Sequence, residues 1–101
     1  MSVNIFNSPL MMNVIERVAQ ERHRQNTLFA EGNISFTCAS RIADPNRKLR
    51  VLVEEVGEVA EAIDILELTK AGRKAAIKHL RDELTQVAAV AVAWLESMED
   101  K

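Results

Sequence analysis

Two groups of acidic residues lie inside apolar, helix-like patterns, where an unpaired carboxylate is costly to bury. The first comprises residues 54–58, with sequence EEVGE, and the second comprises residues 81–86, with sequence RDELTQ. Residues three or four positions apart lie on the same face of a helix, so each group presents its oxygen atoms to one side. Two such faces on packed helices would form an all-oxygen site for a hard divalent cation such as Mg²⁺.

The helical repeat indicates which of these side chains would meet. Successive residues of an α-helix are about 100° apart. Glu83 then falls in the middle of the apolar face of its helix, and Gln86 flanks that face. Glu55 and Glu58 lie beside the apolar face of the preceding helix. We therefore expect these four side chains to converge between two packed helices, where they would bind a metal ion.

The competing interpretation is that the acidic residues form ordinary ion pairs. Arg50 lies four residues before Glu54 and can pair with it without any metal. Glu83 has no such partner on its own face, which leaves pairing, protonation or metal binding to compensate its burial. His23 and His79 are isolated in the sequence, and neither is assigned a role as ligand or base.

The composition predicts a single all-α domain over residues 1–101. The chain is 48% hydrophobic and only 4% aromatic, which allows a core and favours helix packing over a β-sandwich. A net charge of −2 with mixed signs offers no basic surface for nucleic acid. One cysteine excludes an intrachain disulfide. With no signal peptide or transmembrane run, we expect a cytoplasmic protein without nucleic-acid or membrane partners.

The hydrophobic periodicity predicts three main helices, over residues 9–28, 45–68 and 73–98. The first two follow the pairs Ser8-Pro9 and Asp44-Pro45. Each pair combines an N-cap side chain with proline at the first helical position, which is a typical helix start.

The segments between the helices are less regular. Gly72 interrupts the pattern before the third helix and is typical of a helix stop. Residues 34–40 have the composition of a short strand, but no partner strand is apparent. Residues 1–7 are expected to form a flexible arm. The sequence assigns no role to the segment 30–46.

The third helix requires more cover than one chain supplies. From Val87 to Leu95 it is apolar on every side, so several neighbouring helices must pack around it. We therefore expect the bundle of three helices to be completed by oligomerisation, as a homodimer or homotetramer.

Residues 47–63 resemble the first half of the signature of the MazG-like family of all-α nucleoside triphosphate pyrophosphohydrolases. The family pattern is EExxE followed, after a gap, by ExxD. Residues 54–58 match the first half in full. The second half begins at Glu83 but has Gln86 in place of the aspartate. The resemblance covers roughly residues 47–95.

This resemblance implies hydrolysis of a nucleoside or deoxynucleoside triphosphate to the monophosphate and pyrophosphate. It also implies Mg²⁺ as cofactor, with Mn²⁺ as an alternative ion, bound by Glu55, Glu58 and Glu83. Gln86 would hold the fourth position, where a neutral amide oxygen binds a cation more weakly than a carboxylate does. Glu54 or Glu58 would accept the proton of the attacking water.

Basic and amide side chains outside the acidic groups are candidates for substrate binding. Lys48 would contact phosphate as a point charge. Arg22, Arg24 and Gln25 on the first helix would bind the nucleobase or phosphate, and Arg81 is a weaker candidate. The competing interpretation is that these residues form solvated polar faces.

Two other functions remain open. Gln86 favours a catalytically weakened relative that only binds a nucleotide or a metal ion. The apolar stretch from Val87 to Leu95 favours a non-enzymatic helical interaction protein. The sequence does not distinguish the preferred base or sugar, or a dimer from a tetramer.

Overall fold

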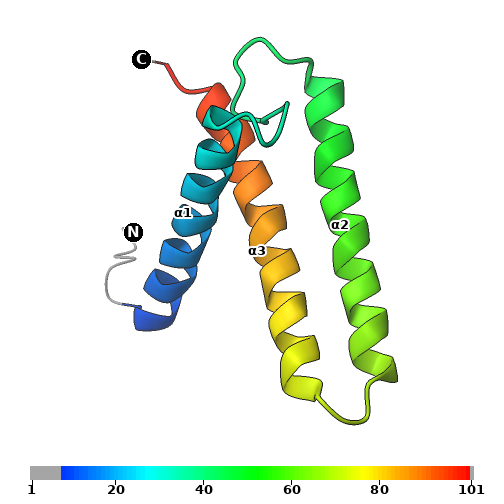
Figure 1. The fold of residues 1–101 in the computed structure, drawn as a ribbon. Helices are drawn as coiled ribbons and strands as arrows, with labels where there is room; N and C mark the ends of the chain where they lie inside the picture. Colours follow the sequence, from blue (N-terminus) through cyan, green and yellow to red (C-terminus); the bar gives the residue numbers. More distant parts are fainter. Residues whose placement is uncertain (1–7, 101) are drawn as a thin grey trace, which may run out of the picture.

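A computed structural model describes residues 8–100, which form three helices and no strand (Figure 1). The helices are α1 (Pro9–Ala30), α2 (Pro45–Leu68) and α3 (Arg73–Ser97). α3 lies between the other two and packs on both, whereas α1 and α2 do not pack directly on each other in this part of the chain. The all-α prediction is confirmed. The arm expected over residues 1–7 lies outside the described residues.

Both helix starts inferred from the sequence are confirmed. Ser8 Oγ accepts a hydrogen bond of 3.2 Å from the backbone N–H of Met11. The carboxylate of Asp44 accepts one of 2.9 Å from the backbone N–H of Asn46. These contacts satisfy amide groups that the first turn of a helix leaves unpaired.

The connection between α2 and α3 differs from the sequence prediction. Gly72 does not end α2, which stops at Leu68; with a φ of 75° it is instead the N-cap of α3. Arg73 closes the end of α2 because its guanidinium donates hydrogen bonds of 3.1 Å to the carbonyl oxygens of Leu66 and Thr69. A side chain from α3 thus satisfies carbonyl groups that the end of a helix leaves unpaired.

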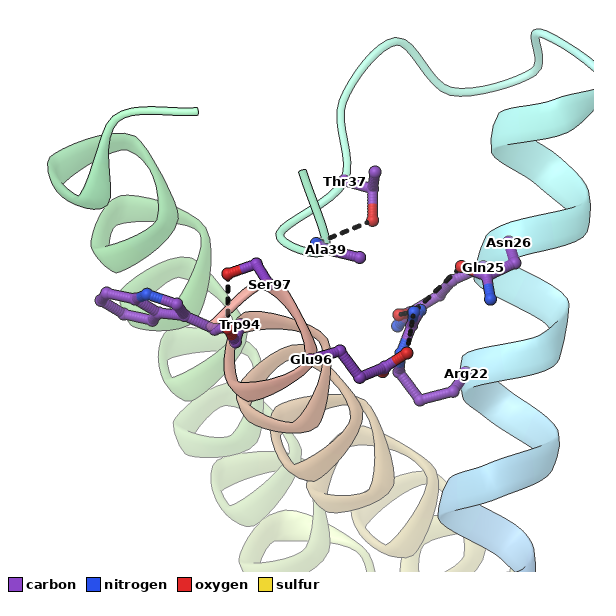
Figure 2. A network of polar contacts seen from close by, with 8 residues as sticks. All are labelled: Arg22, Gln25, Asn26, Thr37, Ala39, Trp94, Glu96 and Ser97. Atoms are coloured by element: carbon purple, nitrogen blue, oxygen red, sulfur yellow. Dashed lines mark hydrogen bonds and ion pairs between the residues drawn. The ribbon is translucent and has the colours of Figure 1, made fainter. Parts of the chain in front are cut away.

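Residues 34–40 are irregular, with a turn at residues 37–40, and do not form the short strand considered from the sequence. Thr37 organises this turn: its hydroxyl accepts from the backbone N–H of Ala39 at 3.2 Å (Figure 2), and its carbonyl accepts from Ser40 at 3.1 Å. A lone extended segment would leave its backbone groups unpaired. The turn also allows Cys38 to be buried against α3.

The buried core lies where this turn meets the carboxyl-terminal half of α3. Cys38, Val90 and Ala93 form its centre, and Phe36 and Trp94 are among the partly buried residues packed around them. No large side chain among residues 8–100 is fully buried. The core of one chain is therefore small.

Two polar contacts, each made by a buried basic side chain, connect the helices at the same end. Arg22 of α1 donates to both carboxylate oxygens of Glu96 on α3 (Figure 2), at 3.2 Å to Oε1. Lys48 of α2 donates to Ser97 Oγ on α3 at 2.7 Å. Arg22 and Lys48 are only 6% and 3% exposed. Because a buried charge requires a partner, these two contacts fix how α1 and α2 sit against α3.

Candidate metal centre between α2 and α3

Three carboxylates from two helices meet where α2 packs on α3. Glu55 and Glu58 of α2 and Glu83 of α3 each place an oxygen atom within 4.8 Å of the other two. Glu55 and Glu83 are partly buried, whereas Glu58 is exposed. The convergence that the sequence predicts for these three residues is observed, and the group opens to solvent on the side of Glu58.

Two oxygen atoms of this group are buried without any hydrogen-bond partner, Glu55 Oε2 and Glu83 Oε2. A buried polar atom without a partner costs free energy, and more so when it carries charge. A cation beside these atoms would remove that cost. The ligand atoms would all be carboxylate oxygens, which suits Mg²⁺ or Mn²⁺ better than a soft metal ion.

The pKa values of Glu55 and Glu83 also indicate that the group favours a bound cation or a retained proton. Burial, followed by the charge and hydrogen bonding of Glu58, raises the pKa of Glu55 to about 7. Burial and hydrogen bonding with Glu58 also raise the pKa of Glu83. Like-charged carboxylates at such distances cannot all be ionised cheaply. Near neutral pH the group must therefore retain a proton or bind a cation in its place.

A fourth carboxylate, which the sequence analysis missed, lies near this group. Glu21 of α1 contributes to the raised pKa of Glu55 through its negative charge. It also forms an ion pair of 2.6 Å with Arg24, and this hydrogen bond raises the pKa of Arg24. Nothing in the local pattern of α1 marks Glu21, because its position depends on how α1 crosses α3.

His79 is closer to the site than the sequence analysis proposed. Its Nδ1 lies 3.9 Å from Glu83 Oε1, and its positive charge, when protonated, opposes the rise in the pKa of Glu83. The assumption that His79 is isolated is therefore wrong. The spacing of four residues between the two was the available signal, since such residues are neighbours on a helix surface.

A cavity of about 190 Å³ adjoins Glu55, one of the three carboxylates. α1, the irregular segment at residues 34–38, α2 and α3 all contribute to its wall. The wall is mostly apolar, and its polar side chains include Gln25, Glu55 and Gln86. Among the apolar residues that line it are Leu28, Ile34, Phe36, Val51 and Val90.

A polar groove of about 440 Å³ lies between α1 and α3 and shares Gln86 with this cavity. Arg17 and Arg24 contribute two positive charges to it, and Glu21 and Asp82 contribute negative ones. Glu21, Arg24 and Gln86 line both the cavity and the groove. The sequence analysis did not identify Arg17, since its neighbours on α1 give no hint of a site.

Four of the residues predicted from the sequence lie elsewhere. Lys48 and Arg22 are held by Ser97 and Glu96 and line neither the cavity nor the groove beside the carboxylates. Glu54 is exposed and outside the group of three. Arg81 lines an apolar groove between α1 and α3 that shares Arg17 and Thr85 with the polar groove.

No protein-family model, curated protein or solved structure matches this chain. Within residues 8–100, none of the helices combines the length and the apolar character that a membrane span requires.

Proposed function

We propose that this protein is a Mg²⁺-dependent nucleoside triphosphate pyrophosphohydrolase. The observation that carries the proposal is the group of Glu55, Glu58 and Glu83, with two buried oxygen atoms that have no partner. The resemblance of residues 47–95 to the MazG-like family supports the same chemistry. The adjoining cavity and polar groove offer space for a nucleoside and for phosphates.

Glu55, Glu58 and Glu83 would bind the metal ion, and Gln86 can add a neutral carbonyl oxygen. When bound, Mg²⁺ offsets the phosphate charge and lowers the pKa of a water molecule. Glu58 is the exposed member of the group, so we assign it the role of accepting the proton of the attacking water. Glu54 lies outside the group and is the weaker candidate for this role.

We place the nucleobase in the apolar cavity. Arg47 covers one face of Phe36, with its guanidinium 3.9 Å from the ring centre, and Phe36 also lines the cavity. Gln25 accepts a hydrogen bond of 3.0 Å from Arg22 through Oε1. The NH₂ group of Gln25 is therefore left to donate to a base.

We place the phosphates along the polar groove, where Arg17 and Arg24 line the wall. Arginine is suited to this contact because its planar fork binds phosphate through two hydrogen bonds. Arg24 is already paired with Glu21, so substrate would compete with that carboxylate. Water would attack the α-phosphorus and release pyrophosphate, leaving the nucleoside monophosphate.

The first test is release of pyrophosphate from a panel of ordinary and modified nucleoside triphosphates, with Mg²⁺, Mn²⁺ or chelator. We expect metal-dependent release from part of the panel. Glu55→Gln and Glu83→Gln should each lower it by about 100-fold or more, because each removes a charged ligand at the metal. Glu61→Gln, a change of the same kind at an exposed position of α2, is the matched control.

Retained turnover in both Glu55→Gln and Glu83→Gln would contradict the proposal. If the folded wild-type protein released no pyrophosphate from any member of the panel, a second function would be favoured, in which the chain only binds a nucleotide or a metal ion. Gln86 favours this alternative because it brings one negative charge fewer than the aspartate of the family pattern.

We further propose that the protein acts as a homodimer or homotetramer in the cytoplasm. Large apolar side chains remain exposed on all three helices, which is unusual for a monomer. Among them are Leu10 and Val14 on α1, Val53 and Val56 on α2, and Leu84 and Leu95 on α3.

A further inference from the structure

α2 carries an apolar stripe that no other part of residues 8–100 covers. Leu49, Val53, Val56 and Ile63 are 47%, 59%, 51% and 40% exposed, and Ala60 between them is also exposed. Their spacing alternates between four and three residues, which is the seam pattern of a coiled coil. At about 100° per residue, all five fall within an arc of roughly 80°.

Gly57 lies at the edge of this stripe, in the middle of α2. Glycine destabilises a helix interior relative to alanine. Apart from its own stretch of α2, no atom of residues 8–100 lies within 4 Å of the position that a Cβ of Gly57 would occupy. Packing inside one chain therefore gives no reason for glycine here, whereas the close approach of a second helix does.

The charges beside the stripe indicate which helix would approach Gly57. Arg50 and Asp64 lie seven residues before and after Gly57, on the same edge of the stripe. Neither forms an ion pair with another residue among residues 8–100. If two copies of α2 pair antiparallel about an axis at Gly57, Arg50 of each faces Asp64 of the partner subunit. In a parallel pair this edge would face the opposite edge of the partner's stripe, and Arg50 could not meet Asp64.

We propose that α2 is the interface of an antiparallel homodimer whose twofold axis passes beside Gly57. The stripe then packs against its own copy, as a twofold interface requires, and two Arg50–Asp64 ion pairs between the subunits fix the register. Glu58 lies about 180° around the helix from Leu49, so the carboxylate group faces away from this interface. The inference does not depend on the proposed enzymatic activity.

The test is the mass of the protein in solution, by light scattering and by sedimentation over a range of concentrations. We expect Val56→Asp to halve the mass, because it places a charge from each chain at the centre of the stripe. Val56 is half-exposed within one chain, so the variant should keep its helix content by circular dichroism. Leu84→Asp makes the same change in the separate groove between α1 and α3 and should leave this dimer intact.

Charge reversal tests the register. Arg50→Asp and Asp64→Arg should each raise the dissociation constant by about tenfold or more, and the double variant should restore it to within about threefold. Lys74→Glu, an exposed reversal on α3, is the control. A monomeric wild-type protein, dissociation by Leu84→Asp but not by Val56→Asp, or a double variant no better than the single ones would each overturn the proposal.

Discussion

At the scale of single residues, Glu55 and Glu83 occupy positions where an ionised carboxylate without a partner costs stability, and this is the basis of the proposed metal site. Each has a buried oxygen without a partner, and each has a raised pKa because burial disfavours its charge. A carboxylate that only stabilised the fold would have the opposite shift, since an ion pair or donated hydrogen bonds lower its pKa.

The stability of the metal-free protein should fall as the pH rises. The pKa of Glu55 increases from 4.5 to about 7 on folding, so between these values the folded state binds more protons than the unfolded state. The free energy of unfolding then decreases with pH in this range. Thermal unfolding without metal should show this decrease from about pH 5 to pH 7, and Glu55→Gln should reduce it.

Mg²⁺ should reverse this effect, because metal binding replaces the proton. The rise in melting temperature on adding Mg²⁺ should be large near pH 8 and small near about pH 5. Glu61→Gln should behave as wild type in both measurements. A pH-independent rise, or an equal rise in Glu55→Gln, would count against a metal site at these residues.

Gln86→Asp should raise the affinity for Mg²⁺ by about tenfold or more, because it adds one anionic ligand to the set. Calorimetric titration of the metal-free protein with Mg²⁺ measures this directly. Gln20→Asp adds the same charge in the neighbouring polar groove and is the matched control. If the affinity for Mg²⁺ rose equally in both variants, the effect would be long-range electrostatics and Gln86 would not be a ligand.

At the scale of elements, α3 is the helix on which the others are assembled. It supplies Glu83 to the carboxylate group and, farther along, Glu96 and Ser97 to the contacts that hold α1 and α2. The small residues Ala89 and Ala93 are buried on it, which allows its neighbours to approach closely. Fastening one end of α3 thus helps to set the relative position of carboxylates that lie several turns away.

Glu96→Ala should lower the free energy of unfolding by about 2 kcal/mol, because it leaves the buried guanidinium of Arg22 without its carboxylate. Arg22 would keep its hydrogen bonds to Gln25 and Asn26, of 3.0 and 2.9 Å, which limits the loss. Urea unfolding at a fixed protein concentration measures the change. Glu99→Ala, an exposed position just beyond α3, should change stability by less than about 0.5 kcal/mol.

At the scale of the whole molecule, one chain is less compact than a typical single domain of its length. Its radius of gyration is 15.6 Å, whereas a compact domain of 100 residues has about 13 Å. α1 diverges from α3 toward its amino-terminal end (Figure 1), and an apolar groove of about 380 Å³ lies between these two helices. Association of chains would supply part of the burial that one chain lacks.

The melting temperature should therefore depend on protein concentration. If folding and association are coupled, a tenfold dilution should lower it by about 3 °C, by mass action. Val56→Asp should unfold at a lower temperature and show a weaker dependence. A melting temperature that stays constant across a hundredfold dilution of the wild-type protein would contradict coupled folding and association.

The sequence by itself determined the features that depend on local geometry. The starts of α1 and α2 follow from Ser8-Pro9 and Asp44-Pro45, because a cap and a proline act within one turn. The convergence of Glu55, Glu58 and Glu83 follows from helical periodicity, which sets the face of each side chain once two helices pack.

Only the tertiary structure decided the features that depend on how the helices cross. It brought Glu21 near Glu55 and placed Lys48 against Ser97, away from the carboxylates. It also made Gly72 the N-cap of α3, whereas the sequence predicted a stop at the end of α2. In each case the partner is on another element or depends on the path between elements, and the periodicity of a single helix contains no information about that partner.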